Sequence, residues 1–161
     1  MVETIERFYA AFSRRDGDAM AACYAPGARF SDPAFGELRG EEPGAMWRML
    51  TGQARDLRVE LGEHGADPSA RTGHAHWTAH YTFTQTGRPV VNRVHATFRF
   101  AEDGRIAEHD DAFSFHAWAR QALGTPGLLL GWTPLLRSKV QANAAAQLAR
   151  FRADRQPPPG A

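Results

Sequence analysis

Apolar and polar side chains alternate along much of the second half of the chain, with a period of two that is incompatible with an amphipathic α-helix. The alternation covers residues 57–61, 74–83 and 92–100 and returns between 105 and about 113. It gives each stretch one apolar and one polar face, which is typical of half-buried β-strands. Short turns containing glycine or proline separate the stretches, so we expect consecutive strands to pair antiparallel.

The residues before these strands follow the three-to-four spacing of helices. This spacing predicts a first helix over residues 2–15 and a second, short helix that continues through Tyr24. We then expect a strand over 28–32, a loop as far as Gly40, and a third helix over 43–52. The order of elements favours an α+β fold in which helices cover one face of a curved antiparallel sheet.

The C-terminal part returns to helices. Ser114 can cap a helix that ends at Gly124, and Thr133-Pro134 can begin a last helix. The apolar stripe of that last helix consists of Leu136, Val140, Ala144, Leu148 and Phe151. We expect one domain over residues 1–153, with a C-terminal helical extension from about 114 and a flexible proline-rich tail over 154–161.

Composition argues against several classes of partner. The 19 Lys and Arg residues against 18 Asp and Glu give a net charge of +1, which is no basis for binding nucleic acid or an anionic membrane. A single cysteine, Cys23, excludes an internal disulfide and favours a reducing compartment, so we expect a cytoplasmic protein. No targeting segment and no apolar run of bilayer length is recognisable. We expect neither a nucleic-acid nor a membrane partner.

Several short motifs resemble one known superfamily. They are IERFYAAF at 5–12, DGD at 16–18, ARFSDP at 28–33, FRF at 98–100 and DGRI at 103–106. Over residues 2–115 they resemble the nuclear transport factor two-like superfamily, which includes ketosteroid isomerases, SnoaL-like polyketide cyclases and scytalone dehydratase. The resemblance implies a cone, in which a strongly curved antiparallel sheet surrounds a deep pocket and N-terminal helices pack on its concave side. It also implies a homodimer formed through the outer face of the sheet.

Within such a cone, the apolar face of each strand becomes the lining of a pocket for a small apolar molecule. His74, His76, His80, His95 and Arg93 are then expected on the outer face. The residues that we expect to bind the ligand are Phe8, Tyr9, Phe12, Trp47, Trp77, Tyr81, Ala96, Phe98 and Phe113.

Asp32 is the first candidate for chemistry. It ends a short strand directly before Pro33. By resemblance to ketosteroid isomerases, where the matching aspartate removes a proton next to a carbonyl, Asp32 would be a general base. The alternative is structural, because an Asp-Pro pair commonly builds a turn in which the carboxylate accepts backbone hydrogen bonds.

His109 and Asp111 form the second candidate. They lie two residues apart on the last strand and share the face of Phe113, where the alternation predicts apolar cover. A carboxylate beside an imidazole is suited to general acid–base catalysis near neutral pH. SnoaL-like cyclases and scytalone dehydratase resemble this chain in placing an acid and a histidine in the cone. Alternatively, residues 108–111 are a charged, wet strand end, and a bulge would turn Glu108 and Asp110 inward instead.

Two departures argue against ketosteroid isomerisation itself. By resemblance, the catalytic tyrosine of that family falls on Phe8, and the acid that donates a hydrogen bond to the oxyanion falls close to Ala96. Without these donors the oxyanion lacks its stabilising hydrogen bonds unless Tyr81, His109 or Asp111 supplies one.

The pattern of histidines does not favour a metal. His74, His76 and His80 could face one side of a strand, but a polar outer face or a dimer interface explains them equally well. We expect no metal and no cofactor. The apolar segment from Gly127 to Trp132 could roof the pocket or dock on a second subunit.

Three functions remain open. The chain could be a cofactor-independent isomerase, cyclase or dehydratase that uses Asp32, His109 and Asp111. It could also be a binding module of the same fold for a small apolar ligand, or a dimerisation module with no ligand. A shared fold cannot choose among them, because one fold supports unrelated chemistries.

Overall fold

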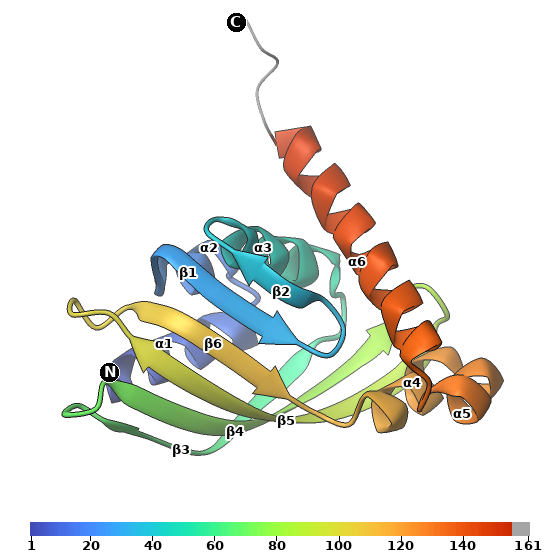
Figure 1. The fold of residues 1–161 in the computed structure, drawn as a ribbon, viewed down its shortest axis with the longest axis horizontal. Coiled ribbons are helices and arrows are strands. Elements are labelled where there is room, and N and C mark those ends of the chain that lie inside the picture. The colour runs from blue at the N-terminus through green and yellow to red at the C-terminus, as the bar shows by residue number, and fades with distance from the viewer. Residues whose placement is uncertain (156–161) are drawn as a thin grey trace, which may run out of the picture.

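The computed structural model describes residues 1–155; the remainder of the expected tail, 156–161, lies outside the described residues. One six-stranded sheet and six helices account for the regular structure of the described chain (Figure 1). In chain order, the elements are α1 (Val2–Ser13), α2 (Gly17–Ala22), β1 (Tyr24–Asp32), β2 (Gly36–Arg39), α3 (Glu42–Gln53), β3 (Arg58–Asp67), β4 (Thr72–Phe83), β5 (Arg88–Phe100), β6 (Ile106–Ala112), α4 (Phe115–Leu123), α5 (Thr125–Leu130) and α6 (Pro134–Arg155).

The strands lie in the order β2-β1-β6-β5-β4-β3. Neighbouring strands are antiparallel except β1 and β6, which run parallel, so the expectation of a wholly antiparallel sheet is wrong at this one pair. Tight turns impose antiparallel pairing only on strands that follow one another, whereas β1 and β6 are joined by most of the domain. The α+β class is confirmed.

The alternation that predicted the strands also predicts which side chains are buried. On β4, Ala75, Trp77 and Ala79 are buried, whereas His76 is exposed. Helices α1, α2 and α3 lie together on one side of the sheet (Figure 1). Ile5, Phe8 and their neighbours on α1 fill the core against this buried face. Burial of each such side chain contributes about 1.5–3 kcal/mol to folding.

Two N-terminal expectations are wrong. The segment expected to be a loop before Gly40 contains β2, which forms a hairpin with β1. Tyr24 belongs to β1 and not to the second helix, because the chain joins the sheet directly after α2. The Ile106 amide donates a hydrogen bond of 2.8 Å to the Cys23 carbonyl, which draws this segment to β6.

The C-terminal helices pack on the rest of the fold, α4 against β5 and α6 against α3. Ser114 caps α4 by accepting a hydrogen bond from the Ala117 amide, as expected. Helix α6 lies past the ends of β1 and β2 and reaches α3 (Figure 1). Its attachments are the buried Leu148, a hydrogen bond from Gln141 to the Pro33 carbonyl, and an ion pair of 3.1 Å between Arg152 and Glu42.

Helix α6 is also longer than expected. It includes residues 154 and 155, which were assigned to the tail. The single-domain organisation over residues 1–153 stays a prediction. Within residues 1–155, no helix combines the length and the apolar character needed to cross a membrane.

Candidate functional site

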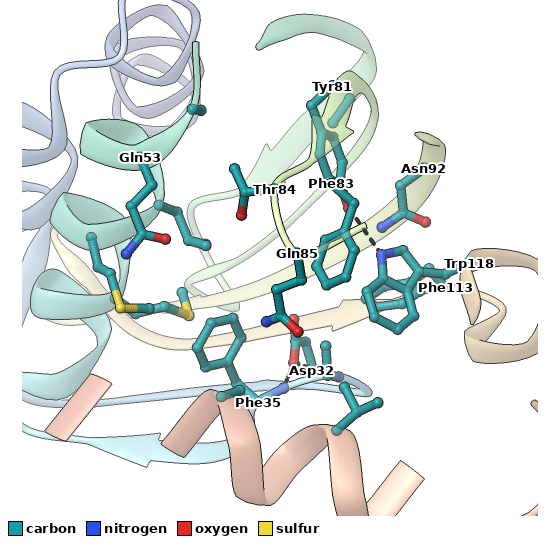
Figure 2. Close-up of a pocket in the computed structure, with 18 of the residues that line it drawn as sticks. Asp32, Phe35, Gln53, Tyr81, Phe83, Thr84, Gln85, Asn92, Phe113 and Trp118 are labelled. Atoms are coloured by element: carbon teal, nitrogen blue, oxygen red, sulfur yellow. Dashed lines mark hydrogen bonds between the residues drawn. The ribbon is translucent and has the colours of Figure 1, made fainter. Parts of the chain in front are cut away.

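A cavity of about 340 Å³ lies between the inner face of the sheet, α3 and α6. Figure 2 shows Tyr81, Phe83, Phe113 and Trp118 on one side of it and Phe35 on the other. Its wall is mainly apolar and rich in aromatic rings. The polar residues of the wall are Asp32, Gln53, Thr82, Thr84, Gln85, Asn92, Asp111, Lys139, Asn143 and Gln147.

Asp32 stands at the end of β1, where the chain turns into β2. Its Oδ1 accepts hydrogen bonds from the amides of Ala34 (2.8 Å) and Phe35 (2.5 Å). These bonds match the turn-building role considered for Asp-Pro, and they leave Oδ2 as a second acceptor. Burial and the negative charge of Asp111 raise the pKa of Asp32 to about 7, against the lowering effect of the Phe35 amide. The side chain therefore exchanges protons near neutral pH while it lines the cavity.

The register of β6 places His109 and Asp111 on the inner face, as the alternation predicts. His109 lies opposite Phe98, and Asp111 lies opposite Ala96. The irregularity in this strand pair falls between Ile106 and Glu108, before both residues, so it does not reverse them. Asp110 points to the other face, where it pairs with Arg29 at 2.6 Å.

A continuous chain of hydrogen bonds connects His109 and Asp111 to two tryptophans. The Trp47 indole donates to the Tyr24 hydroxyl (2.9 Å), and Tyr24 contacts Nδ1 of His109 at 2.7 Å. On the other side of the ring, Nε2 lies 3.1 Å from Oδ1 of Asp111, which also accepts a bond of 3.4 Å from the Trp77 indole.

With Asp111 ionised and His109 neutral, the chain of hydrogen bonds has one direction. An ionised Asp111 can only accept, so Nε2 of His109 carries the hydrogen between them. In a neutral imidazole Nδ1 is then the acceptor, and it takes the single hydroxyl hydrogen of Tyr24. His109 has no exposed surface and is absent from the cavity wall, whereas Asp111 lines it. The imidazole therefore orients the carboxylate from behind and does not reach the cavity.

Tyr9 carries an unsatisfied group close to this chain. Among the buried side-chain nitrogen and oxygen atoms of residues 1–155, its hydroxyl is the one without a hydrogen-bond partner. The ring packs against Trp77 with centroids 5.8 Å apart. Burial, together with the charge of Asp111, raises the pKa of Tyr9 well above its usual value. The hydroxyl stays protonated and available as a donor.

The residues expected to bind a ligand divide into two groups. Phe12, Trp47, Trp77, Tyr81 and Phe113 line the cavity. The other four are absent from its wall and pack in the core instead: Phe8, Tyr9, Ala96 and Phe98. Two of these four surround the imidazole of His109, so they belong to the layer behind the cavity; ring centroids lie 5.5 Å away for Phe8 and 4.4 Å away for Phe98.

Other residues of the site were missed in the sequence. Tyr24 gave no signal because its segment is helical by periodicity. The signal for α6 was present in its apolar stripe, whose members Leu136, Val140 and Ala144 line the cavity, but the stripe does not reveal what it faces. Trp118 of α4 also lines the cavity and donates a hydrogen bond of 2.9 Å to Tyr81, drawn in Figure 2.

The histidines of the outer face do not form a metal site. His76 stacks on His95 with ring centroids 4.5 Å apart, and His80 lies 3.7 Å from Glu60. Over the described part of the chain, no group of three or more His, Cys, Asp or Glu residues could hold a metal ion.

Comparisons with known proteins identify solved structures that share this architecture. Solved structures with a similar fold include a proposed polyketide cyclase from Xanthomonas campestris pv. campestris, at 21% identity and a TM-score of 0.63, covering 75% of this chain and 95% of that one. A protein from Catenulispora acidiphila with a ketosteroid isomerase-like fold, in complex with trimethylamine, gives 18% identity and a TM-score of 0.65 over 82% of this chain and 98% of that one.

A third similar structure is an NTF2-like protein from Burkholderia pseudomallei, at 22% identity and a TM-score of 0.64, covering 75% of this chain and 95% of that one. At these identities the similarity establishes the fold of the nuclear transport factor 2-like superfamily. No curated protein matches the sequence. The model of the SnoaL-like domain matches residues 5–109, about two thirds of the chain. The chain therefore belongs to the SnoaL-like domain family.

Proposed function

We propose that the chain is an enzyme that needs no cofactor and catalyses an isomerisation, cyclisation or dehydration of a small, largely apolar molecule. The substrate occupies the cavity, which we interpret as the interior of the cone. Asp32 and Asp111 carry out the proton transfers, and His109 positions Asp111 from behind.

One observation carries the proposal: two carboxylates from neighbouring strands line a single, mainly apolar cavity. Asp32 ends β1 and Asp111 lies on β6, and these strands pair directly. Close carboxylates in an apolar site resist simultaneous ionisation, so one keeps its proton at a pH where an isolated aspartate would have lost it. Burial is the largest cause of the pKa of about 7 for Asp32, and the charge of Asp111 adds to it.

Such a pair can supply a base and an acid to the same substrate. Asp111, held by the His109 and Trp77 hydrogens, acts as the carboxylate that accepts a proton from a C–H next to a carbonyl or from a hydroxyl group. Protonated Asp32 returns a proton to the developing oxyanion or to a departing hydroxyl. A pKa near the working pH makes Asp32 effective in both directions.

The names of structurally similar proteins are consistent with this chemistry. One is the proposed polyketide cyclase, and another is SalBIII, an epoxide hydrolase/cyclase-like enzyme in pyran ring formation in polyether salinomycin; it gives 16% identity, a TM-score of 0.61 and coverage of 70% of this chain and 88% of that one. Both names refer to cyclases, and neither identifies the substrate of this chain.

A second candidate is a binding protein without catalysis. It is favoured by the hydrogen bonds of Asp111, whose Oδ1 already accepts from both His109 and Trp77. Asp32 likewise builds a turn. Carboxylates occupied in this way can hold a ligand without transferring protons.

The experiment begins with a library of small apolar ketones, lactones and hydroxy ketones, screened by ligand-observed NMR. Compounds that bind are then followed in D₂O for deuterium uptake and for conversion. We expect wild type to exchange or convert at least one compound, and Asp32→Asn and Asp111→Asn to abolish the reaction. Asp110→Asn is the matched control, because its side chain faces away from the cavity. Binding without exchange or conversion would establish the second candidate.

Two further properties belong to this proposal. We propose a homodimer formed through the outer face of the sheet, as the resemblance implies. We also propose a cytoplasmic location, consistent with a single cysteine that is buried. Sedimentation velocity at micromolar concentration tests the dimer.

A further inference from the structure

Five apolar side chains project from one short segment at the edge of the molecule. Leu128, Leu129 and Leu130 of α5 are 50%, 62% and 50% exposed, and Trp132 and Leu135 are 73% and 80% exposed. Single exposed apolar residues are ordinary in proteins, but clusters mark interaction surfaces. Five of the seven large apolar side chains that are exposed in the described chain fall within residues 128–135. We call these five side chains the apolar patch.

The fold holds this patch outward. Helix α5 lies directly against α4, and only a glycine fits at position 127. A Cβ there would come within 1.9 Å of the Ala119 carbonyl oxygen. The Trp132 indole donates a hydrogen bond of 3.0 Å to the Leu129 carbonyl, and His116 binds the Leu128 carbonyl at 3.2 Å. The backbone of α5 is thereby fixed with its leucines away from the core. In Figure 1, α5 stands at the margin of the molecule, beyond α4.

The charged side chains of the segment that carries the patch have one sign. Residues 112–153 contain no aspartate or glutamate, since 17 of the 18 acidic residues of the chain precede residue 112 and the last follows residue 153. Exposed cations lie on the elements next to the patch: Arg120 is on α4, which packs against α5, and Arg137 follows Leu135 on α6. Arg137 also covers the Phe115 ring at 5.3 Å. The near-neutral net charge of the whole chain conceals this basic end.

Charge decides which partner fits. In a two-fold dimer through this patch, each copy would present the same surface to the other, so that Arg120 and Arg137 would approach their own copies with no acidic residue of 112–153 to pair with them. An anionic lipid surface fits both the apolar side chains and the cations. It accepts leucine and tryptophan at the interface and attracts the flanking cations. We propose that the apolar patch and its basic surroundings bind an anionic membrane surface.

The patch also lies beside the cavity. Leu135 is exposed, while its neighbour Leu136 lines the cavity, and Trp118 and Leu123 of α4 line it as well. Binding at the patch would therefore bring the cavity close to apolar molecules dissolved in the bilayer. This inference rests on exposure and charge, and it stands apart from the proposed reaction.

Co-sedimentation of the full chain with vesicles tests the inference. The probes are vesicles of phosphatidylcholine alone and of phosphatidylcholine mixed with phosphatidylglycerol, at low and at high salt. We expect binding to the mixed vesicles that weakens at high salt, and little binding to phosphatidylcholine alone. Arg137→Gln should weaken binding about fivefold, since each cation near an anionic surface contributes about 1 kcal/mol. Leu129→Ser should weaken it about tenfold.

Val91→Ser is the matched control, because Val91 is an exposed apolar residue on β5, outside the patch, and its loss should leave binding unchanged. All three positions are on the surface, so circular dichroism and melting temperature should match wild type. Absence of binding to the mixed vesicles would overturn the inference. So would equal binding to both kinds of vesicle at every salt concentration, or a dimer in sedimentation that Leu129→Ser dissociates, since that dimer would cover the patch.

Discussion

Tyr24 and Tyr9 offer a comparison in which the same chemical change has opposite effects. Both tyrosines are buried, and Tyr→Phe removes one hydroxyl from each. The Tyr24 hydroxyl accepts from the Trp47 indole and contacts Nδ1 of His109. The Tyr9 hydroxyl has no partner. We expect Tyr24→Phe to destabilise the protein and Tyr9→Phe to stabilise it.

The magnitudes follow from the number of polar groups left without a partner. Tyr24→Phe strands the buried indole N–H of Trp47 and Nδ1 of His109. Each buried group left unsatisfied costs about 1–3 kcal/mol, so the free energy of unfolding should fall by about 2–6 kcal/mol. Tyr9→Phe leaves no group unsatisfied and removes one that already is, so the free energy of unfolding should rise by about 1 kcal/mol.

Urea denaturation of wild type and both variants, at one pH and with a shared slope, measures this difference. Thermal melting should separate the two variants by roughly 6 °C or more, because 1 kcal/mol shifts the midpoint of a domain this size by about 2–4 °C. If Tyr9→Phe costs as much as Tyr24→Phe, the Tyr9 hydroxyl has a partner in solution. If Tyr24→Phe costs less than about 1 kcal/mol, the hydrogen bonds from Trp47 through Tyr24 to His109 do not stabilise the fold.

Further predictions concern stability. The free energy of unfolding should fall as pH rises from about 4 to 7, because folded Asp32 keeps a proton until a pKa of about 7 and the unfolded chain releases it near 3.8. The contribution of Asp32 has a limiting slope of about 1.36 kcal/mol per pH unit, and comparison with Asp32→Asn in urea melts across this range isolates it. Leu148→Ala should cost about 2–3 kcal/mol in thermal melts, since Leu148 is the one buried residue of α6. Gly17→Ala should cost about 1–3 kcal/mol by urea denaturation, because its Cβ would come within 2.6 Å of the Arg48 Cα.

The inward position of Asp111 was predictable from sequence because a strand has a period of two. Once Phe113 was placed on the apolar face, Asp111 and His109, two and four residues earlier on the same strand, had to share that face. His109 followed by the same rule, and both residues are buried. The inward positions of His109 and Asp111 were therefore predicted without knowledge of any distance.

What the sequence did not reveal depends on contacts between distant segments. Tyr24 joins the site because β6 pairs with the chain directly after α2, and no local signal marks such pairing. The parallel direction of β1 has the same origin. Asp32 was proposed by resemblance alone, and its raised pKa depends on its burial and on the charge of Asp111, which lies on another strand. Periodicity orients residues within one element but does not determine which elements meet.

The pairing of β1 with β6 has a consequence for biosynthesis. Ser31 and Asp110 form a hydrogen bond although they are 79 positions apart in the chain, and Tyr24 and His109 are 85 apart. During translation, β1 can pair with β2 early but gains its second neighbour only after the last strand, β6, has emerged. Contacts of such long range slow folding, and until then β1 has an open edge that other chains can contact. Expression at lower temperature, which slows synthesis and weakens apolar association, should raise the yield of folded protein.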